Sequence, residues 1–308
     1  MKALLDRLAR YLWPLALANL VANIGIVVTG AAVRLTRSGL GCPTWPRCSD
    51  ESYVAHGELG INGAIEFGNR MLTFALAAVA VLCFLAALGA MHRRATRLSL
   101  VIGLGIPLQA VIGGITVLTD LNPWIVAGHF LLSMAMIMVC VALVDELRSP
   151  DRVAAPPLPR ALAWATLASG WVVLYLGTVV TGAGPHAGDE DSPRNGLDPA
   201  TVSQVHAYAV YVLVALTVAL LVVALRGGQR WLASVTALVL LIEVLQGVLG
   251  WTQYWLDLPV ALVALHMLGA ALLAAGLARI ALAVLPHRAT DEARADEQEQ
   301  TSAATRLP

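Results

Sequence analysis

Apolar residues in this chain are grouped into eight long stretches that polar segments separate. A helix that crosses the hydrocarbon core of a membrane needs about 20 apolar residues, and each stretch approaches or exceeds that length. None has the short apolar region and cleavage site of a secretory signal, and the few residues before the first leave no room for an organellar transit peptide. The pattern therefore predicts eight membrane-spanning helices in a bacterial plasma membrane. Their approximate limits are 12–33, 65–90, 98–118, 125–147, 161–182, 202–225, 231–253 and 259–285.

Composition agrees with a membrane protein and excludes several other classes. Of the 308 residues, 58% are hydrophobic and 13% charged, and the mean hydropathy is +0.74. Soluble domains carry about 25% charged residues, and disordered chains and coiled coils need more polar sequence than this. The formal net charge is zero, which gives no indication of a nucleic-acid partner. We therefore expect an all-α membrane protein that contacts lipid and binds no nucleic acid.

The basic residues indicate the orientation of the chain, because cytoplasmic loops are enriched in Lys and Arg. With the N-terminus inside, 15 of the 20 basic residues fall in cytoplasmic segments. The sequence therefore predicts that both termini are cytoplasmic. The polar tail 286–308 mixes both signs of charge and is expected to be disordered. The basic residues left on the outer side are Arg34, Arg37, Arg47, Arg70 and Arg194.

A weak internal repeat divides the spans into two halves of four. The segment LQAVIGG from Leu108 resembles LQGVLGW from Leu245, and VTGA occurs at Val28 and Val180. Each half crosses the membrane the same even number of times, so the repeat is parallel, with an axis near the membrane normal. We expect two pseudo-symmetric four-helix bundles. The expected units are an N-terminal half at 1–147, a cytoplasmic linker at 148–160 and a C-terminal half at 161–285.

The repeat also aligns polar residues. Each half has a glutamine that stands 20 residues before a histidine and 40 residues after another polar residue. At ~1.5 Å per residue, the polar positions on four helices lie roughly 6–10 Å below the outer surface. We expect them to form a ring at one depth. The two sets are Asn69, Gln109 and His129 in the first half and His206, Gln246 and His266 in the second.

His206 and His266 are candidate haem ligands. An ionisable side chain within a membrane span is costly and indicates function. Two histidines at one depth on different helices can coordinate haem iron from both faces. The sequence therefore predicts a bis-histidine b-type haem between the sixth and eighth spans. The alternative is that each histidine only forms a hydrogen bond between helices.

The first half is not a copy of the second, because Asn69 stands where the second half has His206. Asparagine is a poor haem ligand, so iron held by His129 would keep one open face. A saturated site beside an open one suits electron transfer coupled to chemistry on a second haem. The alternative is that Asn69 forms a structural hydrogen bond with a neighbouring helix.

Glu66 lies one helical turn before Asn69 and shares its face. A carboxyl group at the rim of a membrane cavity suits proton transfer or the stabilisation of a developing cation. It is equally expected of a solvated residue near a helix N-terminus. The outer arginines Arg34, Arg37 and Arg70 lie where haem propionates would emerge, or they anchor the helices at the interface.

Four cysteines divide by location. Cys42 and Cys48 lie six residues apart in the first outer loop, with two prolines between them. This spacing allows a disulfide or a thiol pair that accepts electrons from a redox partner. Metal binding is less expected, because no nearby His or Cys completes a site. Inside the spans, Cys83 and Cys140 are expected to be packing residues, and Glu243 is expected to be protonated or hydrogen-bonded.

Four stretches of the chain resemble the haem A synthase family. They are VRLTRSGLGCPTWPRC in the first outer loop, IEFGNR entering the second span, LQAVIGGITVLTDLNPWIVAGH across the third and fourth spans, and TGAGPHAGD after the fifth. The resemblance implies an oxidoreductase that converts the C8 methyl group of haem O to the formyl group of haem A for cytochrome oxidase. It further implies haem O as substrate, and haem O synthase and the cytochrome oxidase assembly machinery as partners. A homo-oligomer is left open.

The resemblance also implies roles for individual residues. His206 and His266 would hold haem b, His129 would face the iron of substrate haem O, and Glu66 would assist the reaction. Asn69 and Arg70 would lie beside the substrate haem, and Cys42 and Cys48 would be the outer-loop pair. Many family members read E-x-x-H-R where this chain has Asn at the fourth position, so one family histidine is absent. Loop residues His56 and His186 are the possible substitutes.

Two functions of different classes follow. The first is haem A synthase, in which the second-half haem carries electrons away from haem O. The second is a b-type cytochrome that relays electrons between a quinone and an extracytoplasmic partner. A transporter built on the repeat is a third reading and predicts no haem in the purified protein. The identity of the haems in that protein distinguishes the three.

Overall fold

The structure is a computed structural model that describes residues 2–287, and its secondary structure there is helical apart from an isolated bridge between Arg152 and His287. Eight of the described helices are long and apolar enough to cross a membrane. The predicted all-α, multi-pass membrane protein is therefore confirmed by helix length and composition. The eight are α2 (Leu12–Leu35), α3 (Gly60–Gly89), α4 (Arg93–Leu118), α5 (Pro123–Arg148), α6 (Pro157–Ala183), α7 (Pro199–Arg226), α8 (Arg230–Trp255) and α9 (Val260–Ala283).

Two short helices were not predicted. Helix α1 (Lys2–Ala9) precedes the first span and packs on α3, and the single turn η1 (Gly57–Leu59) leads directly into α3. α1 is eight residues long with charged side chains, so it lacks the apolar run that marks a span. α3 begins at Gly60, before the predicted limit of 65, because the helix continues from the membrane span into the outer loop.

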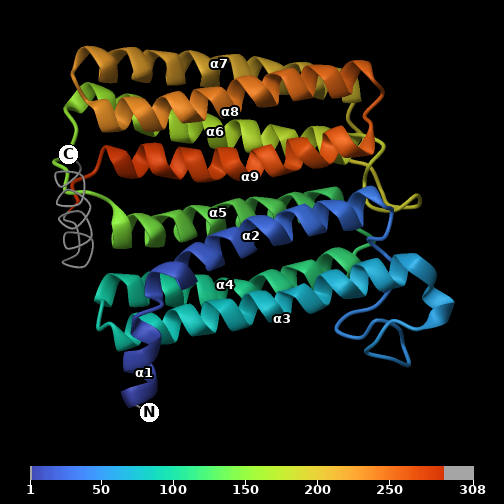
Figure 1. The fold of residues 1–308 in the computed structure, drawn as a ribbon. Coiled ribbons are helices and arrows are strands. Elements are labelled where there is room, and N and C mark those ends of the chain that lie inside the picture. Colours follow the sequence, from blue (N-terminus) through green and yellow to red (C-terminus); the bar gives the residue numbers. More distant parts are fainter. Residues whose placement is uncertain (1, 288–308) are drawn as a thin grey trace, which may run out of the picture.

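The spans lie in two groups of four. α2 packs on α3 and α5, and α4 packs on the same two helices. In the second group, α6 packs on α7 and α9, and α8 packs on the same two. α3 therefore lies opposite α5, and α7 lies opposite α9 (Figure 1). The two groups meet where α2 and α5 contact α9 and where α5 contacts α6.

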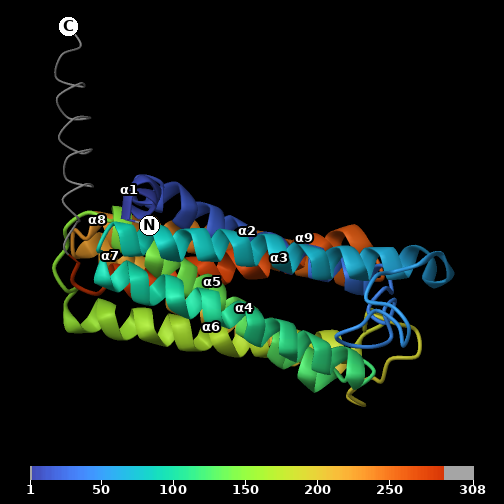
Figure 2. The same cartoon turned by 90° about the horizontal axis from the view of Figure 1, so that it is seen from below.

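The long connecting segments gather at one end of the molecule. Residues 36–56 and 184–198 lie at this end, which we call the loop end (Figure 1, Figure 2). α1, the α5–α6 linker and the last turn of α9 lie at the opposite end, which we call the terminus end. Of the tail predicted to be disordered from 286, Pro286 and His287 are described, and His287 pairs with Arg152. The rest of that prediction, 288–308, falls outside the described residues.

Capping residues fix where α5 and α7 begin. α5 and α7 each start with a proline, which suits the first helical turn. The side chain of Asn122 caps α5, and that of Asp198 caps α7 by accepting the backbone N–H of Thr201 at 2.8 Å. Hydrogen bonds from Thr201 also hold the pKa of the Asp198 carboxyl below its usual range, since they favour the charged form. These caps set the depth of His129 and His206, about two turns further along each helix.

Apolar burial is concentrated toward the terminus end of each group. Buried residues of the first group include Leu76, Ile102 and Cys140, and those of the second include Leu220 and Leu277. At the loop end of the second group, the segments 199–212, 244–255 and 260–270 contain no buried residue. Those segments carry His206, Gln246 and His266, so the polar positions lie above the packed core.

Candidate functional site

Each of the three span histidines lies against a glycine of the preceding helix. A Cβ added at Gly113 of α4 would lie 3.3 Å from Cε1 of His129 on α5. The corresponding distance is 3.4 Å from Gly177 of α6 to His206, and 3.4 Å from Gly250 of α8 to His266. The glycines therefore leave space that the imidazole rings use. The sequence shows part of this pairing of glycine with histidine, because Gly113 and Gly250 each follow the repeat glutamine by four residues.

The histidine rings have polar atoms that the protein leaves unpaired. Within residues 2–287, Nδ1 of His129, His206 and His266 is buried without a hydrogen-bond partner. The alternative of a hydrogen bond between helices stays open for His206, whose ring also lies near the backbone of Val173 on α6. His206 and His266 come from α7 and α9, and each of these helices packs on both α6 and α8.

The repeat glutamines connect neighbouring helices. Gln109 Nε2 donates a hydrogen bond to the backbone carbonyl of His129 at 3.3 Å, and Gln246 Nε2 donates to that of His266 at 2.8 Å. The spacing of 20 residues therefore reflects the same contact in both halves, a hydrogen bond from the glutamine side chain to the histidine carbonyl. It holds the histidine-bearing turn of α5 against α4, and that of α9 against α8.

Asn69 forms the structural hydrogen bond that the sequence left as an alternative. Its Oδ1 accepts a hydrogen bond from Thr29 Oγ1 on α2 at 2.8 Å. Gly25 precedes Thr29 by four residues, just as Gly177 precedes Thr181 in the second half. A Cβ added at Gly25 would meet no atom of the described chain within 4 Å, whereas one at Gly177 meets His206. The histidine-on-glycine contact is therefore missing at this one position of the four.

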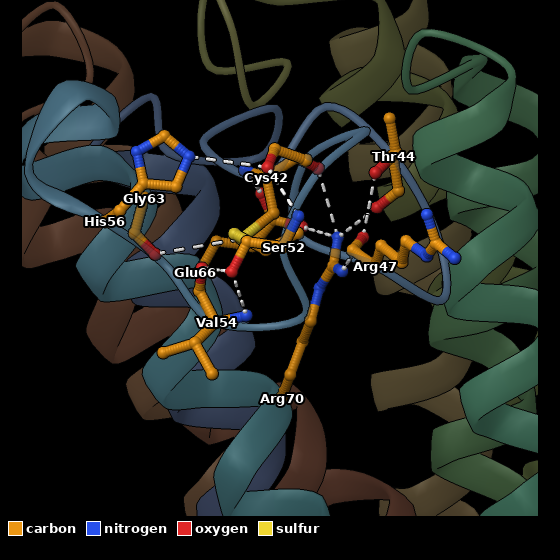
Figure 3. The surroundings of a disulfide bond; sticks show 11 residues. Cys42, Thr44, Arg47, Ser52, Val54, His56, Gly63, Glu66 and Arg70 are labelled. Atoms are coloured by element: carbon orange, nitrogen blue, oxygen red, sulfur yellow. Dashed lines mark hydrogen bonds and ion pairs between the residues drawn. A yellow bond between two sulfur atoms is a disulfide. The ribbon is translucent and has the colours of Figure 1, made fainter.

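Glu66 and Arg70 join α3 to the first outer loop, as Figure 3 shows. Glu66 is 5% exposed. Its Oε2 accepts the backbone N–H of Cys42 at 2.6 Å, and its Oε1 accepts Arg70 Nη2 at 2.6 Å. Arg70 also donates to the carbonyls of Cys42, Thr44 and Arg47, each at 3.1 Å. One guanidinium thus satisfies three loop carbonyls and one carboxylate, which fixes the loop over the loop end of α3.

The outer loop is closed by a disulfide between Cys42 and Cys48. Its backbone packs closely on α3, because a Cβ at Gly41 would lie 2.3 Å from the carbonyl oxygen of Asn62. The Trp45 ring lies against α4, where a Cβ at Gly114 would lie 2.3 Å from it. Glycine is required at both positions, and the loop covers the first helix group from α3 to α4.

Sequence comparison assigns the family. The model of a family described as cytochrome oxidase assembly protein matches residues 13–189, more than half of this chain. A haem A synthase of Bradyrhizobium sp. strain ORS 278 is 27% identical over 329 aligned positions, covering 85% of this chain and 87% of that protein. The chain belongs to the haem A synthase family.

Two further haem A synthases match over shorter regions. That of Bacillus pumilus strain SAFR-032 is 27% identical over 168 residues, 50% of this chain and 53% of that protein. That of Bradyrhizobium sp. strain BTAi1 is 28% identical over 215 residues, 58% of each chain. The family match by the model ends at 189, just beyond α6, so it includes Glu66, Arg70 and His129 and excludes His206 and His266.

The remaining candidate residues are engaged in other contacts. Arg34 donates to the carbonyl of Thr181 on α6 at 3.1 Å, and Arg37 pairs with Glu190 on the surface. Of the three outer arginines predicted together, the structure therefore brings only Arg70 to Glu66. His56 contacts Ser49 at 3.3 Å, and His186 contacts the carbonyl of Leu258 at 2.9 Å.

Glu243 lies near the middle of α8, below the histidines, where Oε1 accepts Thr217 Oγ1 at 2.8 Å. It is 3% exposed, in line with the expected hydrogen bond. Cys83 and Cys140 are free and buried, as expected of packing residues. Among residues 2–287 no group of three or more His, Cys, Asp or Glu could hold a bare metal ion.

Proposed function

We propose that this protein is a haem A synthase, which oxidises the C8 methyl group of haem O to the formyl group of haem A for cytochrome oxidase. Family membership supports a role in haem A biosynthesis. The observation that carries the proposal is the contact of a span histidine with a glycine, made three times at the loop end, with a helix-joining glutamine beside two of the three. It supplies one histidine site in the first group and two in the second.

The two helix groups act as pseudo-symmetric halves in this proposal. Residues 1–147 form the half that binds haem O, 161–285 form the half that binds haem b, and 148–160 link them. The same cyclic order of helix contacts in both groups supports this division. If α2 is matched with α6 and α5 with α9, the contact between α2 and α9 corresponds to the contact between α6 and α5. This correspondence also supports the division.

In the second half, His206 and His266 would hold the haem iron from opposite helices. Their rings fit this role because glycines make space beside them at the loop end. A haem b bound there supplies one-electron chemistry. Gln246 positions His266 by holding its backbone carbonyl.

In the first half, His129 would bind the iron of substrate haem O, and Gln109 would hold the turn that carries it. Asn69 accepts a hydrogen bond from Thr29 and would supply no second ligand to that iron. Glu66 would take up a proton, or stabilise positive charge, as the methyl group is oxidised. Arg70 keeps that carboxylate in place and ties it to the outer loop.

The cellular setting follows from the same proposal. The relatives are bacterial proteins, so we place this chain in the bacterial plasma membrane with both termini in the cytoplasm. The loop end, with its disulfide, then faces the oxidising side. Haem O synthase would supply the substrate, and the cytochrome oxidase assembly machinery would receive the product.

Expression together with haem O synthase, in cells that otherwise make no haem A, tests the proposal. Extracted haems are separated by chromatography, and the purified protein is examined by pyridine haemochrome spectra. We expect haem A in these cells, loss of the low-spin b-type spectrum in His206→Ala and His266→Ala, and retention of that spectrum in His129→Ala. The loop variant His56→Ala is the control and should behave as the parent. Haem b without any haem A would instead identify an electron-relaying b-type cytochrome.

A further inference from the structure

Glu243 lies at the boundary between the packed core of the second helix group and its loop end. Going down from the loop end, the first buried residues are Leu213 on α7, Glu243 on α8 and Ala271 on α9. These three residues form the first buried layer below His206 and His266. An ionisable side chain inside a membrane span is costly and by default indicates function. The oxidation of haem O, as proposed above, leaves this carboxyl group unused.

The Glu243 carboxyl contacts a threonine that also has a second acceptor. Thr217 Oγ1 lies 2.8 Å from Glu243 Oε1 and 3.0 Å from the backbone carbonyl oxygen of Leu213. A threonine hydroxyl has a single proton, so it cannot donate a full hydrogen bond to both oxygens. A neutral carboxyl makes both contacts hydrogen bonds, because its own O–H can donate to Oγ1 while Thr217 donates to Leu213. A carboxylate has no proton and leaves one of the two contacts without a hydrogen bond.

The helices around Glu243 carry no Lys or Arg at its level. α8 packs on α7 and α9, and neither has a Lys or Arg within two turns of Thr217 or Ala271. Arg279, further along α9, pairs with Asp145 of α5. The other titratable or charged side chains of the three helices are His206, Tyr208, Tyr211, Arg226, Arg230, Tyr254 and His266. A carboxylate at Glu243 would therefore lack a balancing charge from the protein, which is costly for a buried group.

Glu243 lies about two helical turns below the level of the His266 ring. A Cβ added at Gly250 would lie 3.4 Å from Cε1 of His266, and Gly250 follows Glu243 by seven residues. This separation is ~10 Å along α8 at ~1.5 Å per residue. Over that distance, at an effective dielectric constant of about 20, one unit of charge changes the proton affinity of a carboxyl group about tenfold or more. Glu243 is therefore within electrostatic reach of a haem iron held by His266.

We propose that Glu243 is the proton site coupled to the electron on haem b. Its carboxylate takes up one proton from water when the iron gains one electron and passes from the ferric to the ferrous state. The proton is released when that electron leaves. The added electron removes a positive charge within reach of Glu243, which favours the neutral carboxyl. The inference rests on the haem b site of the proposed function, and it means that electrons from haem O enter the second half without changing its net charge.

Redox titration of haem b in the purified holoprotein at several pH values tests the coupling. We expect the midpoint potential of the parent to fall as the pH rises, by up to about 59 mV per pH unit for one proton per electron. Glu243→Gln can still contact Thr217 but cannot titrate, so this dependence on pH should be lost. Glu146→Gln is the matched control. It neutralises a carboxyl at the terminus end of α5, where Glu146 pairs with Arg94 at 3.1 Å, and should keep the parent profile.

Infrared difference spectra between the reduced and oxidised holoprotein give a second readout. Proton uptake predicts a carboxylic acid C=O band that appears on reduction, shifts in D₂O and is absent from Glu243→Gln. Thr217→Val removes the hydroxyl but keeps the carboxyl, so it should shift both this band and the pH range of the potential. It serves as the second variant if Glu243→Gln does not retain haem b.

Three results would overturn the inference. They are a parent potential that does not change with pH, a parent profile retained in the variants of Glu243 and Thr217, and the absence of a carboxylic acid band on reduction. Each of these leaves haem b in place and the proposed function intact. A purified parent protein without haem b would instead overturn the haem b site and this inference together, so the two failures are distinguishable.

Discussion

The backbone N–H of Cys42 donates a 2.6 Å hydrogen bond to Oε2 of Glu66, so the disulfide loop and the buried carboxylate of α3 form one structural unit. Arg70 completes the unit by contacting the carboxylate and three loop carbonyls. Anything that moves the loop therefore moves the carboxylate. Conversely, Glu66 has both a structural contact to the loop and its proposed role in the oxidation, and substitutions can separate the two.

The variants Glu66→Gln and Glu66→Ala make that separation. The glutamine can still accept the Cys42 N–H but has no charge, so we expect haem A formation to fall about a hundredfold or more while haem b remains. The alanine also leaves a buried N–H unpaired, which costs about 1–3 kcal/mol of stability. Haem chromatography and thermal unfolding measure the two effects, with Glu58→Gln in the exposed turn η1 as control. Full activity in Glu66→Gln would leave this residue only its structural role.

The Cys42–Cys48 disulfide should stabilise the outer loop. Closing a loop of this size contributes about 2 kcal/mol in the chain-entropy account. We expect a reductant to lower the unfolding temperature of the parent protein, and Cys48→Ser to lower it without reductant. The serine variant should then be insensitive to reductant, because it has no disulfide left to reduce and Cys83 and Cys140 are already free thiols. Equal unfolding temperatures for the parent and the variant would show that the disulfide does not stabilise the fold.

The glycines beside the histidines should be needed for haem b. A Cβ at Gly250 already lies 3.4 Å from His266 Cε1, so the branched side chain in Gly250→Val must displace the ring. Overpacking of this kind costs about 1–3 kcal/mol, and we expect haem b affinity to fall about tenfold or more. Gly25→Val is the matched control, since a Cβ there meets no described atom within 4 Å. The haem b content of the two purified variants is compared by pyridine haemochrome spectra, and similar contents would argue against the assigned site.

The sequence predicted the parts of this structure that repeat. Eight apolar runs indicated the spans, and the spacing of 20 residues placed Gln109 and Gln246 at equivalent positions. The structure shows that both make the same contact to a histidine carbonyl, which the sequence did not predict. Contacts to backbone carbonyls were missed, because a carbonyl acceptor has no residue type to identify it. Arg70 was predicted beside a haem propionate or as an interfacial anchor, and its contacts to three loop carbonyls were not foreseen. The contacts of Arg152 at the end of α9 had no sequence signal.

Asn69→His should give the proposed haem site of the first half a second histidine ligand. The change removes the hydrogen bond from Thr29 and adds an imidazole on the side of Gly25. A Cβ added at Gly25 would meet no described atom within 4 Å, so there is space for the ring. We expect a haem held by His129 to become six-coordinate and low-spin. The measurement is best made in a His266→Ala background, which removes the b-type signal of the second half, and Asn69→Gln is the control. A spectrum that stays high-spin would show that position 69 does not face the iron.

Asp145→Asn should loosen the contact between the two helix groups. The change leaves Arg152 and Arg279 without their shared carboxylate, and the Arg152 side chain is only 9% exposed. Removing one partner of a buried ion pair costs about 3–5 kcal/mol, so we expect a clearly lower unfolding temperature. Asp257→Asn, in an exposed turn whose positive φ asparagine tolerates, should have little effect. Because Asp145 lies at the terminus end and the histidines near the loop end, haem b content at low temperature should not change. A variant that unfolds at the parent's temperature would mean that the apolar contacts of α5 with α9 hold the two groups together without the ion pairs.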